Sequence, residues 1–441
     1  MRGSRLDKDF FRGILDTMRF PGYREIPIFF SFLTVIAALL AGCGDLSLDA
    51  GGSGSGFLLA SSVSAGDNHS CAVSSGAVKC WGRNSSGQLG NDTVFDSPSP
   101  VLVTGITDAV QVSAGGSHTC ARLSNGTVWC WGNNADGQLG DNTTTGSRVP
   151  VQVQGITAAT GISAGGNHTC AVLADGTARC WGNNLNGQLG NGTNNDSSLP
   201  VAVSGITSVA AIAAGGIHTC AVLTDGTVRC WGSNVLEQLG NSVLLPGSRS
   251  NVPVIATSVA SAVNITAGGN HTCVSVSFPG TRVRCWGNNF SGQLGSAWTV
   301  VFTPAPVFET TSNDPLTVNG ITSATGVVAA GLDHSCALIS SDNTVRCWGE
   351  NGSGQLGNLT TFSFVPPGAG ASSSSTVFPV TVSGINSATQ ITAGLFHSCA
   401  LLSSNRVMCW GANSSGQLGD GSLLSSFTPV LVTDTTGAGL Q

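Results

Sequence analysis

Residues 150–190 read PVQVQGITAATGISAGGNHTCAVLADGTARCWGNNLNGQLG, and this pattern recurs seven times in the 441-residue chain. It contains four short valine-rich runs bounded by glycine turns, which is typical of β-strands. A repeat of about 50 residues with four strands is one blade of a β-propeller. We therefore predict an all-β, seven-bladed β-propeller with four-stranded blades. β-Helices use much shorter coils, and helical repeats need a 3.6-residue apolar spacing that these runs lack.

The two ends of the repeat array indicate how the ring closes. The first copy lacks its own Pro-Val strand, whereas Pro429–Val432 follows the last Gln-Leu-Gly and no later copy uses it. We expect this C-terminal strand to pair into blade one. Pairing of both chain ends would remove the exposed sheet edge that an open array presents.

Each copy carries two cysteines, one in a His-Ser/Thr-Cys triplet and one at the start of a Cys-Trp-Gly triplet. Between Cys170 and Cys180, the three-residue tip Ala174-Asp175-Gly176 fits a hairpin turn with a glycine bulge, which sets the two cysteines opposite each other. Opposed residues have Cα atoms roughly 4.5–5.5 Å apart, within the range of a disulfide. The predicted disulfides are Cys71–Cys80, Cys120–Cys130, Cys170–Cys180, Cys220–Cys230, Cys273–Cys285, Cys336–Cys347 and Cys399–Cys409.

The alternative for these cysteines is metal binding, because His-x-Cys with a second Cys could supply three ligands. Seven equivalent metal sites fit an exported protein poorly, and paired cysteines outside the cytosol normally oxidise. We therefore expect no metal site, and no catalytic cysteine, because every thiol of the repeats has a partner.

The N-terminal segment has the order of an export signal. Arg19 and Arg24 precede an almost wholly apolar run from Ile26 to Ala41, and Leu40-Ala41-Gly42-Cys43 resembles the lipobox of bacterial lipoproteins. A membrane-spanning helix is the alternative, but the run is shorter than the usual ~20 residues. We expect cleavage before Cys43, lipid attachment to Cys43 and anchoring in a bacterial cell envelope.

The predicted organisation follows from these features. Residues 1–42 are a signal peptide that starts at Met1 or Met18, and residues 43–60 are a Gly/Ser-rich tether. Residues 61–434 form the propeller, which we expect to be a monomer, and residues 435–441 form a tail.

Other side chains recur with the repeat and predict structural roles. All seven histidines occupy one position, so we interpret them as hydrogen-bonding residues and the seven Cys-Trp-Gly tryptophans as wedges between blades. Lys or Arg precedes the second cysteine in five copies. These cations either stack on the indoles or form a ring that binds an anionic ligand.

The composition excludes several functions. The formal net charge is −6, and no basic stripe could neutralise phosphates, so we expect no nucleic-acid partner. No Ser/His/Asp arrangement, phosphate-binding glycine loop or carboxylate pair stands apart from the repeat. We predict no catalytic residue, no enzymatic activity and no cofactor.

The repeat resembles the regulator of chromosome condensation family over about residues 61–433. The matching elements are Ala-Gly-x-x-His, Asp/Asn-Gly-Thr-Val, Trp-Gly-x-Asn-x-x-Gly-Gln-Leu-Gly and the Pro-Val strand. The resemblance implies a seven-bladed propeller. The founding member is a nuclear exchange factor for a small GTPase that also docks on chromatin; other members are scaffolds, and one secreted bacterial relative inhibits β-lactamases by binding them. Glu237 departs from the pattern, because the other six copies have Gly there, and it would be strained if the position has a positive φ.

Function in such an array sits where the copies differ. The loop between Gln-Leu-Gly and the next Pro-Val strand is expanded after blades four (241–252), five (296–314) and six (358–378), and all three loops leave the ring on one rim. Aromatic and aliphatic residues on these loops suit a binding surface. The candidate partner-binding residues are Trp298, Val301, Phe302, Phe308, Phe362, Phe364 and Val365.

Three functions remain open at this point. The first is an exported, lipid-anchored, non-enzymatic propeller that binds an unknown protein or glycan through the expanded loops. The second is a GTPase exchange factor, as in the founding member, which would require a cytosolic location. The third is an extracellular enzyme with an active site in the channel, which would require a polar cluster specific to one blade.

Overall fold

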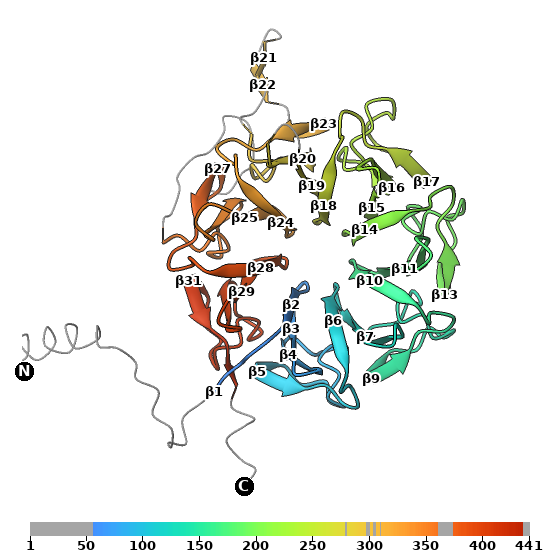
Figure 1. Cartoon of the computed structure of the whole chain (residues 1–441), viewed down its shortest axis with the longest axis vertical. Helices are drawn as coiled ribbons and strands as arrows, with labels where there is room; N and C mark the ends of the chain where they lie inside the picture. The colour runs from blue at the N-terminus through green and yellow to red at the C-terminus, as the bar shows by residue number, and fades with distance from the viewer. Residues whose placement is uncertain are drawn as a thin grey trace, which may run out of the picture. The chain divides into compact units, whose positions relative to one another are not determined.

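The computed structural model describes residues 56–277, 280–296, 300–302, 306–308, 310–359 and 374–434. Within these ranges the chain forms seven four-stranded antiparallel sheets arranged around a central axis (Figure 1). The predicted all-β, seven-bladed propeller is therefore confirmed. The described residues contain no helix that could span a membrane.

Every blade runs from an inner strand at the axis to an outer strand at the rim. Blades one to four consist of β2 (Ser62–Ala65), β3 (His69–Ser74), β4 (Ala77–Gly82) and β5 (Ser97–Leu102); β6 (Ala109–Ala114), β7 (His118–Leu123), β8 (Val128–Gly132) and β9 (Ser147–Gln152); β10 (Ala159–Ala164), β11 (His168–Leu173), β12 (Ala178–Gly182) and β13 (Ser197–Ala202); and β14 (Val209–Ala214), β15 (His218–Leu223), β16 (Val228–Asn234) and β17 (Ser248–Ile255). Blades five to seven consist of β18 (Ala262–Ala267), β19 (His271–Val276), β20 (Arg282–Asn288) and β23 (Thr311–Thr317); β24 (Ala324–Ala330), β25 (His334–Ile339), β26 (Val345–Gly349) and β27 (Thr376–Thr381); and β28 (Ala388–Ala393), β29 (His397–Leu402), β30 (Val407–Gly411) and β31 (Ser426–Leu431). A separate two-stranded sheet pairs β21 (Val300–Phe302) with β22 (Pro306–Phe308) inside the loop after blade five.

The antiparallel register divides the connections between two faces of the ring. In blade one, Gly82 pairs with both His69 and Ser97, so the β2–β3 turn and the β4–β5 loop lie on the same face. We call this side, with its equivalents in the other blades, the loop face. The β3–β4 turns and the links between blades lie on the opposite side, which we call the terminal face.

The chain ends meet on the terminal face, and the predicted closure of the ring by both ends is confirmed. β1 (Gly56–Phe57) pairs with β32 (Thr433–Asp434), and Leu59 bridges to Arg406 in the β29–β30 turn. The Arg406 guanidinium lies 4.4 Å from the centre of the Phe57 ring, and Lys79 forms an ion pair with Asp434. The first and last blades are thereby joined by backbone pairing and by charge.

Two details differ from the sequence prediction. The Pro-Val strands lie in the sheet that precedes them in the chain, so Pro429–Leu431 pairs as part of β31 with β30 in blade seven, and β32 alone continues to β1. The reason is that the loop after Gln-Leu-Gly returns along the outer edge of its own blade. The predicted tether also ends earlier than residue 60, because Leu58 is fully buried and packs with Val432.

The hydrophobic core consists of seven clusters, each shared by two successive blades. One cluster joins Val128, Leu139 and Ile156 to Trp181 of the following blade. All seven Cys-Trp-Gly tryptophans are fully buried, and the indole N–H of Trp181 donates to the carbonyl of Gln138 in the preceding blade at 2.9 Å. The tryptophans are therefore wedges between blades.

Seven disulfides cross-link the middle hairpins of the blades. Each joins the two cysteines of one copy, and their Cα atoms lie 4.0 to 4.1 Å apart. In blade three, Cys170 and Cys180 are direct partners in the β11–β12 register, as the hairpin tip predicts.

Candidate functional site

The seven histidines form a closed ring of contacts between blades. The imidazole Nε2 of His118 lies 2.8 Å from the hydroxyl of Thr169 in the next blade, and His397 contacts Ser70 across the closure at the same distance. The hydroxyl of Thr169 also donates to the carbonyl of Gln138 at 3.0 Å. Since a carbonyl can only accept, the hydroxyl proton points to Gln138, and the imidazole donates through Nε2–H.

These histidines are neutral structural groups. All seven side chains are fully buried, and their Nδ1 atoms have no hydrogen-bond partner. Burial lowers the pKa of His69, His168, His218 and His334 to about 3 and that of His118, His271 and His397 to about 4. The glycine three residues before each histidine leaves room for the imidazole. A Cβ on Gly66, for example, would lie 2.6 Å from His69 Cε1. With these lowered pKa values the imidazoles are neutral near pH 7.

The inner strands surround a central cavity of about 490 Å³. Its wall is held by hydroxyls between blades: Ser64, Ser113 and Ser163 each accept the backbone N–H of an alanine in the next blade at 2.9 to 3.0 Å. Asp67 is an acidic residue at the mouth of this cavity, at a position where the next four blades have glycine. Burial raises the pKa of Asp67 to about 6.

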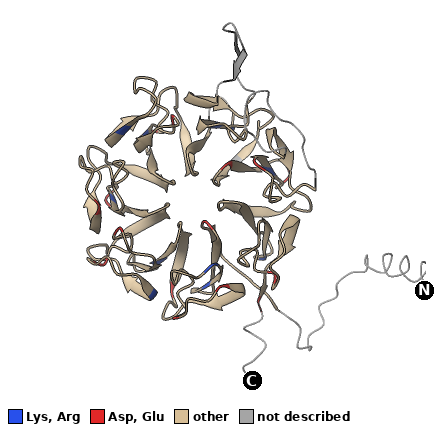
Figure 2. Ribbon diagram, turned by 180° about the vertical axis from the view of Figure 1, so that it is seen from behind, with Lys and Arg blue, Asp and Glu red and all other residues tan. Residues whose placement is uncertain are grey.

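Among the described residues that line the cavity, Asp67 is the one titratable side chain. General acid and base roles would require a second such group close to it. In the described part of the chain, no three His, Cys, Asp or Glu side chains form a group that could hold a metal ion. Charged residues are spread thinly around the ring rather than gathered at its centre (Figure 2).

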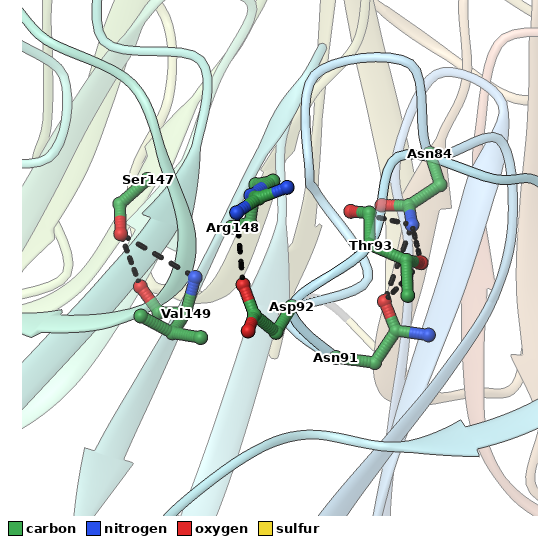
Figure 3. Close-up of polar contacts among 7 residues, drawn as sticks. All are labelled: Asn84, Asn91, Asp92, Thr93, Ser147, Arg148 and Val149. Atoms are coloured by element: carbon green, nitrogen blue, oxygen red, sulfur yellow. Dashed lines mark hydrogen bonds and ion pairs between the residues drawn. The ribbon is translucent and has the colours of Figure 1, made fainter.

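The loop face is ordered by side-chain amides. In blade one, the Asn84 amide donates to Asn91 Oδ1, to the Thr93 carbonyl and to the Thr93 hydroxyl at 3.0 to 3.2 Å (Figure 3). Asp92 then reaches the next blade, where its carboxylate lies 3.2 Å from the Arg148 guanidinium (Figure 3). Asn134, Asn184 and Asn413 make the same network in their loops. The asparagine amides therefore tie these standard loops to their own blade, and Asp92 also ties its loop to the next blade.

Several loops of this face expose large apolar side chains. Val243 and Leu245, in the expanded loop after blade four, are 83% and 77% exposed. Phe95 and Leu424 are each 78% exposed, although they lie in the unexpanded loops after blades one and seven. The sequence prediction missed Phe95 and Leu424, because it used loop length as the signal. The exposed apolar surface thus extends beyond the three expanded loops.

The predicted partner-binding residues lie mostly outside the described residues. Trp298, Phe362, Phe364 and Val365 are not described, nor is the predicted lipid-attachment residue Cys43. Val301 and Phe302 lie in β21, and Phe308 lies in β22, which pair with each other. Their role in partner binding stays a prediction.

The cations that precede the second cysteine do not stack on tryptophan in the described residues. Arg284 donates to the carbonyl of Ser258 at 2.8 Å, and Arg346 donates to the carbonyl of Gly320 at 3.1 Å. Lys79 pairs with Asp434 at the ring closure. These three side chains therefore hold turns and termini on the terminal face.

Known protein families match this chain closely. The RCC1-like domain model matches residues 52–312, and models of the regulator of chromosome condensation (RCC1) repeat match residues 327–355, 342–401 and 388–417. The Ultraviolet-B receptor UVR8 of Arabidopsis thaliana is 42% identical over 62 residues, which cover 13% of this chain and 14% of the receptor. The probable E3 ubiquitin-protein ligase HERC6 of Homo sapiens is 34% identical over 158 residues, covering 35% of this chain and 13% of the ligase. The chain thus spans less than one sixth of the length of these relatives.

Solved structures share the fold. Yeast RCC1 (Prp20), in a crystal structure with Kap60, superimposes with a TM-score of 0.70 and 19% identity, over 89% of this chain and 90% of that chain. Human WBSCR16 superimposes with a TM-score of 0.64 and 22% identity, over 78% of this chain and 87% of that chain. At these sequence identities the similarity shows that the fold is shared.

Proposed function

This chain belongs to the regulator of chromosome condensation (RCC1) repeat family, and from this premise we propose that it is a non-enzymatic binding module that engages a protein through its loop face. The observation that carries the proposal is the exposed apolar surface of that face. Val243, Leu245, Phe95 and Leu424 are each at least three-quarters exposed. Large apolar side chains exposed on one face are available for contact with a protein partner.

The proposal includes an N-terminal lipid anchor. The described chain enters the propeller at β1 on the terminal face, where β1 pairs with β32. The proposed attachment of lipid to Cys43 lies outside the described residues and is supported by the lipobox-like sequence before it.

Seven disulfides favour an oxidising location outside the cytosol. We propose export to a bacterial cell envelope on this ground, together with the predicted signal peptide. Exchange on a small GTPase is the activity of the founding family member, but a cytosolic GTPase would not meet a disulfide-bonded, exported propeller. A protein partner is favoured over a glycan, because the exposed side chains of the loop face are aliphatic as well as aromatic.

Site-specific photo-crosslinking on intact cells tests this proposal. A benzophenone amino acid at position 95, 245 or 424 should give protein adducts, and the same probe at position 175 on the terminal face should give none. Adducts from position 175 alone, or no adducts from the loop face, would reject the proposed binding face.

A further inference from the structure

The seven similar blades can be compared with one another. We call the contact between the Gln-Leu-Gly turn of one blade and the outer strand of the next blade a seam, and one of the seven seams differs from the others. The residue before Gln-Leu-Gly has a positive φ in every blade. It is glycine in six of them, with φ of 78° to 87°, whereas Glu237 of blade four has φ of 64°. A non-glycine residue in this region is strained, and such strain persists where the surroundings enforce it.

The six glycines are required because the next blade lies close to them. A Cβ atom would lie 2.6 Å from Ser198 Cα at Gly137, 2.6 Å from Asn251 Cα at Gly187 and 2.4 Å from Pro98 Cα at Gly416. Those atoms belong to the outer strands of the following blades. Glu237 carries a Cβ at the position where the other six seams have none.

A second departure occurs five residues later in the chain. The N–H of Asn142 donates to the carbonyl of Ser198 at 3.0 Å, and the N–H of Gly192 donates to that of Asn251 at 2.9 Å, so both bonds tie a loop to the next blade. The equivalent N–H of Ser242 instead donates to the Thr257 hydroxyl of its own blade at 3.3 Å. The loop of blade four therefore lacks this backbone bond to blade five, and a side chain ties it instead: the Asn313 amide of β23 donates to the Leu244 carbonyl at 3.4 Å.

A third departure is the state of the polar groups that order the other loops. The Asn234 amide Nδ2 is buried and has no partner, although Asn84 and its equivalents donate from this position to their loops. Asn241 Oδ1 instead accepts the N–H groups of Val243 and Leu244 at 3.0 and 3.1 Å. This arrangement holds Val243 outward. On the facing strand, Asn313 Oδ1 is also buried without a partner.

The residues that differ at this seam lie near Glu237, an acidic residue on a loop face that is itself rich in acidic residues. No hydrogen bond or ion pair among the described residues engages the Glu237 carboxylate, and Arg249 donates to the carbonyl of Leu185. The loop face carries three arginines, Arg83, Arg148 and Arg249, against ten acidic residues: Asp67, Asp92, Asp96, Asp136, Asp141, Asp196, Glu237, Asp333, Glu350 and Asp420. A basic partner would be attracted to such a face.

We propose that the seam between the Gln-Leu-Gly turn of blade four and β23 is the docking point of the protein partner, and that the partner presents a Lys or Arg side chain to Glu237 between aliphatic side chains that pack on Val243 and Leu245. This inference rests on the proposed function and specifies the chemistry of the partner.

A random nine-residue peptide library displayed on phage, selected on the full-length oxidised protein, tests the proposal. The enriched sequences should place Lys or Arg between Leu, Ile or Val, and Glu237→Lys should shift the enrichment to Asp or Glu. For a synthetic peptide of the leading sequence, Glu237→Gln should weaken binding about three- to fivefold, the range of an exposed ion pair. Glu237→Gly, which restores the residue of the other six blades, should fold normally and lose the same binding.

A matched control separates this seam from the rest of the face. Leu245→Ser should reduce peptide recovery, whereas Leu185→Ser, an exposed leucine beside the standard seam of blade three, should leave it unchanged. Enrichment without charge preference, the same enriched sequences for Glu237→Lys and the natural chain, or an equal loss in Leu185→Ser would overturn the assignment of the seam. Crosslinks from positions 95 and 424 would then still support the loop face as the binding face.

Discussion

Acid should destabilise the propeller steeply below pH 6, because the buried histidine ring must stay neutral. The pKa of each histidine is lowered by burial to about 3 or 4, against about 6.5 in an unfolded chain. Between these values the unfolded chain binds protons that the folded chain does not. The free energy of unfolding therefore falls as the pH falls through this window.

The size of the effect follows from the number of protons taken up. At pH 5 nearly every unfolded histidine is protonated and almost none in the fold, so seven histidines take up about six protons on unfolding. Asp67 acts in the opposite direction, since its raised pKa of about 6 keeps it protonated in the fold, and Asp333 has a raised pKa from burial and the nearby Glu350. A net uptake of about five protons remains, or roughly 7 kcal/mol per pH unit.

Proton uptake can be measured directly by unfolding the oxidised protein in urea at pH 5 without buffer and titrating the change. The dependence of the urea midpoint on pH between 4.75 and 5.5 gives the same number independently. His168→Gln keeps a side-chain donor toward Thr219 but does not titrate, so it should lower the uptake by about one proton. A net uptake below two protons, or no change in His168→Gln, would show that the histidines are not held neutral by the fold.

Three further predictions concern stability at pH 7, measured by urea unfolding. Thr169→Val should lower the free energy of unfolding by about 1–3 kcal/mol, because it leaves the His118 N–H without an acceptor, whereas Thr169→Ser should change it by less than about 1 kcal/mol, since serine fills this position in blades one, six and seven. Replacing Cys170 and Cys180 together by alanine should cost about 2–3 kcal/mol through the lost loop closure; an unchanged midpoint would contradict this account of the bond. Glu237→Gly should stabilise the protein by up to about 1 kcal/mol through relief of the positive φ, and a loss of stability would mean that the Glu237 side chain contributes to the fold.

The sequence predicts the blades and their disulfides well because both depend on short-range spacing. A hairpin tip of fixed length sets Cys170 opposite Cys180 whatever the rest of the chain does. The position of Glu237 in a positive-φ turn also follows from the glycines of the other six copies. In both cases, comparison of the seven copies identifies the required register or backbone conformation, which one copy alone would not.

Other features depend on contacts between blades, which spacing does not encode. Each Pro-Val strand lies between two copies of the repeat in the sequence, so it could pair with either. In the structure the preceding loop turns back, and the strand pairs antiparallel with the sheet of the earlier copy. The partner of each histidine lies in the next blade, about 50 residues away. The exposure of Phe95 and Leu424 depends on how Asn84 and Asn413 tie their loops, not on loop length.

The ring can remain closed although one seam contributes less stability than the others. A positive φ at Glu237 costs of order 1 kcal/mol, and the missing bond from Ser242 to blade five forgoes about 1 kcal/mol more. Six other seams, seven disulfides and the paired chain ends hold the ring, so a loss of this size does not open it. A partner that pairs with Glu237 would therefore bind beside a carboxylate that no described residue engages, and it would break no backbone bond between Ser242 and blade five.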